Sequence, residues 1–256
     1  MNPLRSLILA AAGNDTIRKV VATAPGGKQV VNRFVAGETC ADAVAAVAGL
    51  ADRGLCATLD YLGENTTGAE QAERTVREYL TLLDRLHAEG LAESAEVSVK
   101  LSALGQKVDE KLAEDNAWRI CAAAEQCRTT VTVDMEDHTT TDSTLRVVAD
   151  LRRTWPWVGA VMQSYLRRTE SDLAELAVPH SRVRLVKGAY AEPPQVAFPA
   201  AHDVDLSFVR CVNALLSGGG YPMFATHDPR LIEVIADRAR VHRKQPGSYE
   251  FQLLYG

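Results

Sequence analysis

Hydrophobic and polar positions along the chain follow two alternating periods. Short apolar segments, several of them polar at every second position, have the period of β-strands. Each is followed by a stretch whose apolar residues recur every three or four positions, as in an amphipathic helix. The pattern predicts strands at 55–60, 97–101, 130–134, 159–165, 182–187, 222–226 and 249–254, with helices over 67–86, 110–126 and 145–155, from 169 onward, over 209–216 and over 231–241.

Three sites carry signals for the start of a helix. Asp228, followed directly by a proline, is an N-cap with proline at the first helical position, where its missing N–H is not needed. Thr67 and Glu70 have the spacing of a capping box, and Thr169 opens a similar segment that ends at Asp172. We therefore expect helices to begin just after these three caps.

Strands that alternate with helices predict an α/β fold built on a parallel sheet. Gly218–Gly220 has the wrong spacing for a dinucleotide-binding signature and precedes a strand, which disfavours a doubly wound nucleotide-binding sheet. The alternative is a TIM-like (β/α)8 barrel over 51–256, with the last strand and helix missing from this sequence. Residues 1–50 look helical, and we expect them to form an N-terminal arm.

Composition describes an ordinary globular chain. The 256 residues fit one large domain or two small ones, and with 46% hydrophobic residues, 24% charged residues and a formal net charge of −5 the chain has no general signature for binding nucleic acid. Five cysteines without a CxxC pair indicate reduced thiols in the cytoplasm. Leu7–Ala12 is interpreted as a short helix rather than a secretory signal, and no run is apolar enough to span a bilayer.

Candidate chemistry gathers where the strands end, which is where a barrel places its active site. Ser98 and Lys100 share one face of a strand, and Asp134 has the matching face on the next, so the lysine and the aspartate are expected to meet inside the barrel. Buried charges need partners, and these two supply each other. The ring of polar strand ends comprises Asp60, Lys100, Asp134, Gln163, Arg184, Lys187, Tyr190, Thr226, His227 and Gln252.

The alternation of side chains also places the residues at the end of the fifth predicted strand on two different faces. Arg184 and Tyr190 lie six residues apart and share a face, whereas Lys187 faces the opposite way. Gly188, which follows it, would let a flat ligand or a phosphate approach the backbone closely.

Other chemistries fit this ring less well. The segment Asp134–His138 holds three carboxylates and a histidine, but neighbouring strand positions point in opposite directions, so a metal site would need His227 as well. No metal site is therefore predicted. A Schiff-base aldolase that uses Lys100 or Lys187 is a further alternative. Neither an HExxH helix nor a GxSxG elbow occurs.

Eight segments, in order along almost the whole chain, carry a family resemblance: Arg33–Thr39, Leu59–Glu64, Val97–Ser102, Val133–Asp137, Ala160–Tyr165, Arg184–Tyr190, Ala225–His227 and Tyr249–Gly256. Together they resemble the proline dehydrogenases, the FAD-dependent family that oxidises L-proline to 1-pyrroline-5-carboxylate. Each segment alone is weak, but the ordered set is specific. The chain is far too short for the bifunctional form with a fused aldehyde dehydrogenase, so it resembles the monofunctional type.

The resemblance implies a site at the strand ends of a distorted barrel. Arg184 would lie near the flavin N5 atom and Asp134 beside the substrate, both as catalytic residues, while Lys100 would bind the proline carboxylate and Tyr190 would wall the substrate pocket. A quinone would accept the electrons, a separate 1-pyrroline-5-carboxylate dehydrogenase would use the product, and contact with the inner face of the membrane would be peripheral. The FAD would be lined by Met135, Gln163, Arg184, Lys187, Gly188, Ala189, Thr226 and His227.

One departure from the family pattern concerns the C-terminal side. The family closes its site with a last helix that carries a tyrosine, two adjacent arginines and a glutamate, and this sequence ends before that helix. Lys100 alone would hold the substrate carboxylate weakly, so we expect weak proline binding. The alternative function is a non-catalytic or ligand-binding barrel that keeps the fold.

Overall fold

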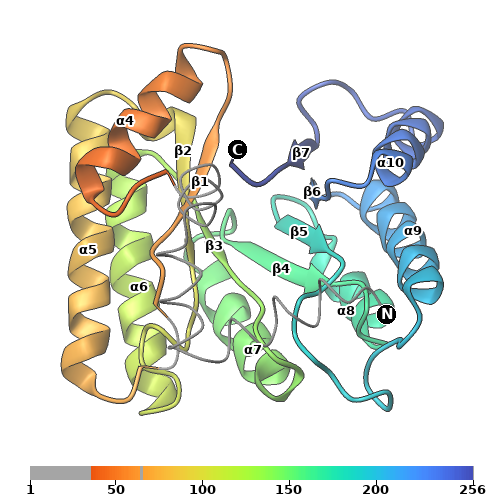
Figure 1. Ribbon diagram of the computed structural model, residues 1–256, viewed down its shortest axis with the longest axis horizontal. Helices are drawn as coiled ribbons and strands as arrows, with labels where there is room; N and C mark the ends of the chain where they lie inside the picture. The colour runs from red at the N-terminus through yellow and green to blue at the C-terminus, as the bar shows by residue number, and fades with distance from the viewer. Residues whose placement is uncertain (1–35, 64–65, 256) are drawn as a thin grey trace, which may run out of the picture. The chain divides into compact units, whose positions relative to one another are not determined.

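The computed structural model describes residues 36–63 and 66–255 (Figure 1). The chain divides into two compact units, residues 1–46 with 254–256 and residues 47–253. The second unit contains the whole sheet. Helix α4 (Cys40–Ala51) corresponds in sequence to the last part of the expected N-terminal arm. Residues 1–35 lie outside the described residues, so the arm as a whole stays a prediction.

Seven parallel strands form one sheet in the described residues, and their order in space follows their order in the chain. Each strand overlaps a segment that the alternating pattern predicts, so the parallel α/β architecture is confirmed. The strands are β1 (Ala57–Asp60), β2 (Ala95–Val99), β3 (Val131–Val133), β4 (Gly159–Gln163), β5 (Arg182–Val186), β6 (Tyr221–Ala225) and β7 (Glu250–Gln252).

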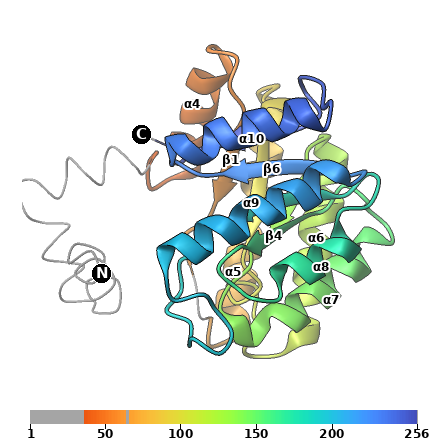
Figure 2. The ribbon, with the colours of Figure 1, turned by 90° about the vertical axis from the view of Figure 1, so that its right-hand side faces the viewer.

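Helices connect successive strands and lie along the outer side of the sheet (Figures 1 and 2). Short 3-10 turns, η1 (Ala92–Ser94) and η2 (His138–Thr140), precede β2 and α7. The helices are α5 (Ala69–Ala88), α6 (Glu110–Cys127), α7 (Thr141–Arg152), α8 (Thr169–Leu176), α9 (Ala201–Ser217) and α10 (Pro229–Val241).

The sheet is strongly curled. In a flat sheet, with strands about 4.8 Å apart, β1 and β5 would be separated by about 19 Å. Yet Nη2 of Arg184 on β5 lies 3.4 Å from the hydroxyl of Thr58 on β1 and 3.0 Å from the carboxylate of Glu96 on β2. The strands therefore bend around these side chains as the staves of a barrel do, and the TIM-like fold class is confirmed.

The hydrophobic core lies between the sheet and the helices rather than inside the curl. Leu185 of β5 and Phe224 of β6 are fully buried in one cluster with Phe208 of α9 and Ile235 of α10. Burying a side chain of this size contributes about 1.5–3 kcal/mol. Because the outward strand positions supply most of this core, most inward positions of β1, β2 and β3 carry polar or charged side chains, whereas Met223 of β6 faces Arg182 inside the curl.

The predicted helix starts have mixed outcomes. Asp228 caps α10 as expected, since its carboxylate accepts a backbone N–H of the first turn at 3.1 Å. The capping box at Thr67 is wrong, because Gly68 takes the N-cap position of α5 and no side chain caps it. The cap at Thr169 is also wrong, because its buried hydroxyl donates to the carbonyl oxygen of Gln163 at 2.6 Å. A tertiary hydrogen bond has replaced the local one.

All five cysteines carry free thiols in the structure, and their place in a reducing cytoplasm stays a prediction. Burial raises the pKa of Cys121 to about 12 and that of Cys211 to about 11, so both remain protonated at neutral pH. Within the described part of the chain, no helix combines the length and the apolar character that crossing a bilayer requires.

The close approach of β3 and β4 can be tested at Gly159. We expect Gly159→Ala to lower the free energy of unfolding by about 1–3 kcal/mol, because the added Cβ would overlap the hydroxyl oxygen of Thr132 on β3. Urea denaturation followed by circular dichroism measures the change. Gly49→Ala in α4 is the matched control: its Cβ meets open space, and we expect a gain of about 0.5–1 kcal/mol. A Gly159→Ala protein as stable as the wild type would contradict the close approach.

Candidate active site

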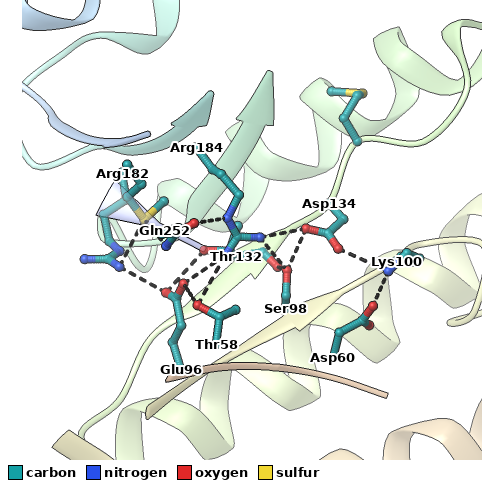
Figure 3. Close-up of polar contacts among 12 residues, drawn as sticks. Thr58, Asp60, Glu96, Ser98, Lys100, Thr132, Asp134, Arg182, Arg184 and Gln252 are labelled. Atoms are coloured by element: carbon teal, nitrogen blue, oxygen red, sulfur yellow. Dashed lines mark hydrogen bonds and ion pairs between the residues drawn. The ribbon is translucent and has the colours of Figure 1, made fainter. Parts of the chain in front are cut away.

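The concave face of the sheet carries a row of charged and hydroxyl side chains (Figure 3). Strand β2 and the residue after it supply Glu96, Ser98 and Lys100, which share a face because side chains alternate along a strand. The register pairs Ser98 with Thr132 on β3, so Asp134, two residues further on, projects beside Lys100. The predicted meeting of Lys100 and Asp134 is observed, with Nζ and Oδ2 3.2 Å apart.

Arg184 of β5 is held from several sides of its guanidinium group. The residue is only 8% exposed, and a guanidinium has five N–H donors in a fixed plane. Its acceptors come from β1, β2, β7 and the residue after β3, so the orientation of the group is set by side chains from across the sheet. Nε donates to Gln252 at 2.5 Å, Nη1 to Asp134 at 2.9 Å and Ser98 at 3.0 Å, and Nη2 to Glu96 at 3.0 Å and Thr58 at 3.4 Å.

Asp134 connects the arginine to the lysine. One carboxylate oxygen accepts from the Ser98 hydroxyl at 2.6 Å and from Arg184, and the other accepts from the Lys100 ammonium. Its side chain is 19% exposed, which leaves it partly open to a ligand at the mouth. The Asp134 carboxylate thus lies between the Arg184 guanidinium and the Lys100 ammonium and links the two.

Lys100 lies between two carboxylates. Its ammonium group pairs with Asp60 after β1 as well as with Asp134. Burial by itself lowers the pKa of Lys100, but Asp134 and Asp60 together outweigh burial and raise it above the ordinary value. For Asp60 the balance is reversed, because burial raises its pKa more than Lys100 lowers it. Tyr79 of α5 supports this end, donating to the carbonyl oxygen of Ser98 at 2.7 Å.

The charges of this row balance. Three carboxylates (Asp60, Glu96 and Asp134) face three cations (Lys100, Arg182 and Arg184) through ion pairs. A Schiff-base lysine needs a lowered pKa to act as a nucleophile, and Lys100 is held in the opposite state. Lys187 is likewise paired, with Asp205 at 2.7 Å and Asp228 at 3.2 Å. This electrostatic arrangement disfavours the aldolase alternative.

Gln163 ends β4 beside the same mouth and is 3% exposed. Its amide nitrogen donates to the carbonyl oxygens of Met135 at 3.0 Å and Glu136 at 3.1 Å. Its amide oxygen is buried and has no hydrogen-bond partner among the described residues. An unpartnered buried acceptor is costly unless a ligand donates to it, so this oxygen marks a place for an N–H or O–H donor.

The backbone conformation of Gly188 and its contact with a neighbouring ring both favour glycine at this position. Its φ of +116° is a conformation that other residues rarely adopt, and a Cβ there would overlap the ring of Tyr165. The Tyr165 ring therefore fills the space on the Cβ side of Gly188, and close approach of a ligand to its backbone stays a prediction. Ala189, next along the chain, is exposed, and Tyr190 is half-buried.

The remaining predicted site residues lie on the helix side of the mouth. Lys187 points to α9 and α10, where its two aspartate partners lie, as its strand parity predicts. Thr226 follows β6, and its hydroxyl accepts the N–H of Asp228 at 3.1 Å. His227 comes next in the chain and is exposed. Lys100, Asp134 and Arg184 are thus joined directly, while Lys187 and Thr226 form a second group with Asp228.

The side chains of the acidic segment after β3 bind different partners and do not form a metal site. Asp134 turns inward, Glu136 accepts from Ser102, Asp137 accepts the N–H of Thr139 at 2.9 Å, and the ring of His138 pairs with Glu192. In residues 36–63 and 66–255, no three histidine, cysteine or acidic side chains gather in a way that could hold a metal ion.

Two groups were missed by the sequence patterns. Glu96 and Arg182 extend the charged row away from the mouth, and the parity that selected Ser98 and Lys100 includes Glu96, so this signal was available. The second group joins His138 to Glu192 and to the Tyr165 hydroxyl, which donates to Glu192 at 3.3 Å. It links loops that are far apart in the chain, and no local pattern indicates it.

A family model and several relatives similar to this chain carry the name proline dehydrogenase. The family model described as proline dehydrogenase matches residues 43–256. Proline dehydrogenase 1 of Bacillus subtilis subsp. natto is 35% identical over 253 residues, which are 99% of this chain and 83% of that protein. The proline dehydrogenase of Deinococcus radiodurans is 38% identical over 232 residues, covering 89% of this chain and 74% of the relative.

A solved structure gives the matching fold. Proline utilization A from Bdellovibrio bacteriovorus, inactivated by N-propargylglycine, superposes with a TM-score of 0.81 at 23% sequence identity. The match covers 90% of this chain but only 29% of that much longer one. At this level of identity the likeness concerns the fold.

The electrostatics of Lys100 predict a stability loss that depends on pH. Lys100→Met leaves Asp60 and Asp134 without their ammonium partner, and breaking such a pair should cost about 3 kcal/mol at neutral pH. The pKa of Asp60 is already raised by burial and rises further without Lys100. A carboxyl whose folded-state pKa exceeds its unfolded value favours folding when protonated, so the loss should shrink as the pH falls through that pKa.

Urea denaturation of both proteins at about pH 5 and about pH 8 measures this difference. Lys111→Met in α6 is the matched control, because Lys111 is 64% exposed and pairs with Asp115 at the surface. We expect the control to match the wild type at both pH values. A Lys100→Met loss of equal size at both would contradict the assigned electrostatics.

Proposed function

The chain belongs to the proline dehydrogenase family, whose members oxidise proline, and we propose that it does so by passing a hydride from L-proline to N5 of a bound FAD. The product would be 1-pyrroline-5-carboxylate. The observation that carries the proposal is the hydrogen-bonded row Lys100, Asp134 and Arg184 at the mouth of the barrel. This row places two fixed cations on either side of one carboxylate.

The chemistry of the mouth fits an isoalloxazine ring. The pyrimidine part of that ring carries several acceptors and one ring N–H donor. The buried amide oxygen of Gln163 has no hydrogen-bond partner among the described residues and suits such a donor, while Arg184 offers positive charge to the acceptors. The residues that would hold the cofactor are Met135, Gln163, Arg184, Lys187, Gly188, Ala189, Thr226 and His227. When bound, FAD supplies the two-electron acceptor.

Arg184 would stabilise the negative charge that reaches the ring with the hydride. Donors that are already fixed before reaction need no reorganisation, and removing one typically slows catalysis by about 10²–10³-fold. The contacts of Arg184 to Asp134, Ser98, Glu96 and Gln252 provide this fixation. Arg184 and Asp134 are the proposed catalytic residues.

Lys100 would bind the substrate carboxylate. Its raised pKa keeps the ammonium charged, and an incoming carboxylate would take the place of one of its aspartate partners. Asp134 would lie beside the substrate ring, and Tyr190 would form part of the pocket wall. Holding the carbon next to the amine about 3–3.5 Å from the acceptor is then a matter of orientation.

The wider setting follows from the reaction. Electrons from the reduced cofactor would pass to a quinone, which implies transient contact with the inner face of the membrane by a cytoplasmic protein. The product would be consumed by a separate 1-pyrroline-5-carboxylate dehydrogenase.

Flavin reduction tests the proposal. Purified protein supplied with FAD should show bound flavin absorbance, and anaerobic L-proline should bleach it. Arg184→Lys should keep the flavin but slow its reduction by about 10²–10³-fold. Arg210→Lys is the matched control on the surface of α9, where Arg210 is 46% exposed and pairs with Glu170, and it should behave as the wild type. A protein that binds no flavin, or an Arg184→Lys variant that is reduced at the wild-type rate, would overturn the proposal.

The pH dependence of the same step provides a further test. Hydride leaves the carbon only when the substrate amine is unprotonated, and Lys100 does not titrate near neutrality because its pKa is raised. The rate of flavin reduction should therefore rise from about pH 6 to about pH 9, measured by anaerobic stopped-flow. A rate that falls across this interval would contradict the assignment of Lys100 as the charged group that binds the substrate.

A further inference from the structure

Glu96 lies deeper in the barrel than the proposed catalytic row. It comes two residues before Ser98 on the inner face of β2 and is 7% exposed. Its two carboxylate oxygens accept hydrogen bonds from five groups, which use every lone pair that a carboxylate offers. Oε1 accepts from Thr58 at 2.9 Å and Arg184 at 3.0 Å, and Oε2 accepts from Arg182 at 3.0 Å, Thr130 at 3.0 Å and Thr132 at 3.3 Å.

The two carboxylate oxygens of Glu96 contact different groups. Oε1 faces Arg184 and Thr58, whereas Oε2 faces Arg182 and two threonine hydroxyls. Arg184 therefore sits between two carboxylates, with Glu96 on Nη2 and Asp134 on Nη1. The Asp134 side is partly open, but the Glu96 side is closed: the side chain of Glu96 is 8% exposed and that of Arg184 is 10% exposed.

We propose that Glu96 is a positioning residue that sets how much positive charge Arg184 presents to the cofactor. The inference rests on the proposed binding of FAD at this mouth. The carboxylate fixes the guanidinium from the closed side and offsets part of its charge in a region with little water, where charges act strongly on one another. Arg182, on the other oxygen, weakens that offset by sharing the same carboxylate.

This arrangement makes opposite predictions for two changes that each remove one charge. Glu96→Gln removes a negative charge and leaves Arg184 less neutralised, so it should shift the equilibrium between oxidised and reduced flavin at least tenfold toward the reduced form. For a two-electron couple that is about 30 mV. Arg182→Gln removes the competing cation and should shift the equilibrium in the opposite direction. A residue that only holds the fold together would not give shifts of opposite sign.

The experiment measures the midpoint potential of the bound flavin in FAD-loaded wild type, Glu96→Gln, Arg182→Gln and the double variant. The double variant restores the charge balance and should return close to the wild-type potential. If Glu96→Gln alone does not fold, the difference between Arg182→Gln and the double variant gives the same quantity. Thr130→Val, which removes a neutral hydroxyl partner of Oε2, is the control and should leave the potential unchanged.

The Michaelis constant for proline provides a second readout. Lys100 lies four residues further along the chain, about 13 Å away, so KM in Glu96→Gln should stay within about twofold of wild type for a change confined to the flavin side. Shifts of the same sign in both single variants, or no shift in either, would overturn the role of Glu96 while leaving proline oxidation intact. A wild-type protein that takes up no FAD would overturn both proposals, which separates the two failures.

Discussion

Charges on the inside of the curled sheet must be paired, and this requirement organises the rest of the molecule. A buried unpaired charge is costly, whereas a paired and hydrogen-bonded one is tolerated. The inner face satisfies this requirement with three carboxylates and three cations, which form ion pairs along β2 and across the sheet to β5. Most apolar side chains lie on the outer face, where they form the core with the helices. The inner face is mostly polar and charged, although Met223 of β6 lies beside Arg182 on it.

This balance prepares the mouth for a reaction that moves charge. Proline oxidation removes a hydride from a carbon and delivers negative charge to an acceptor, so the protein needs positive groups whose positions do not change during the step. Arg184 and Lys100 are such groups, and Asp134 holds them at a set spacing. In the proposed function the partly open end of the row would face the ligands, while the closed end, at Glu96, is surrounded by protein.

Much of this could be predicted from local sequence, and the remainder depends on long-range contacts. Strand alternation was enough to place Lys100 and Asp134 on one inner face. The contacts of Arg184 with Thr58 and Glu96 were not predictable, because they need the curl of the sheet and join residues 126 and 88 positions apart. The cap expected at Thr169 failed for a different reason, since its hydroxyl donates to the carbonyl oxygen of Gln163 at the end of the preceding strand, β4.

The hydrogen bonds of Arg184 also limit when the site can form during folding. Its partners range from β1 to β7, at sequence separations of 50 to 126 residues, and such distant pairings form slowly. Gln252 lies on β7, the last described strand. The full set of contacts to Arg184 can therefore form only after β7 has been synthesised.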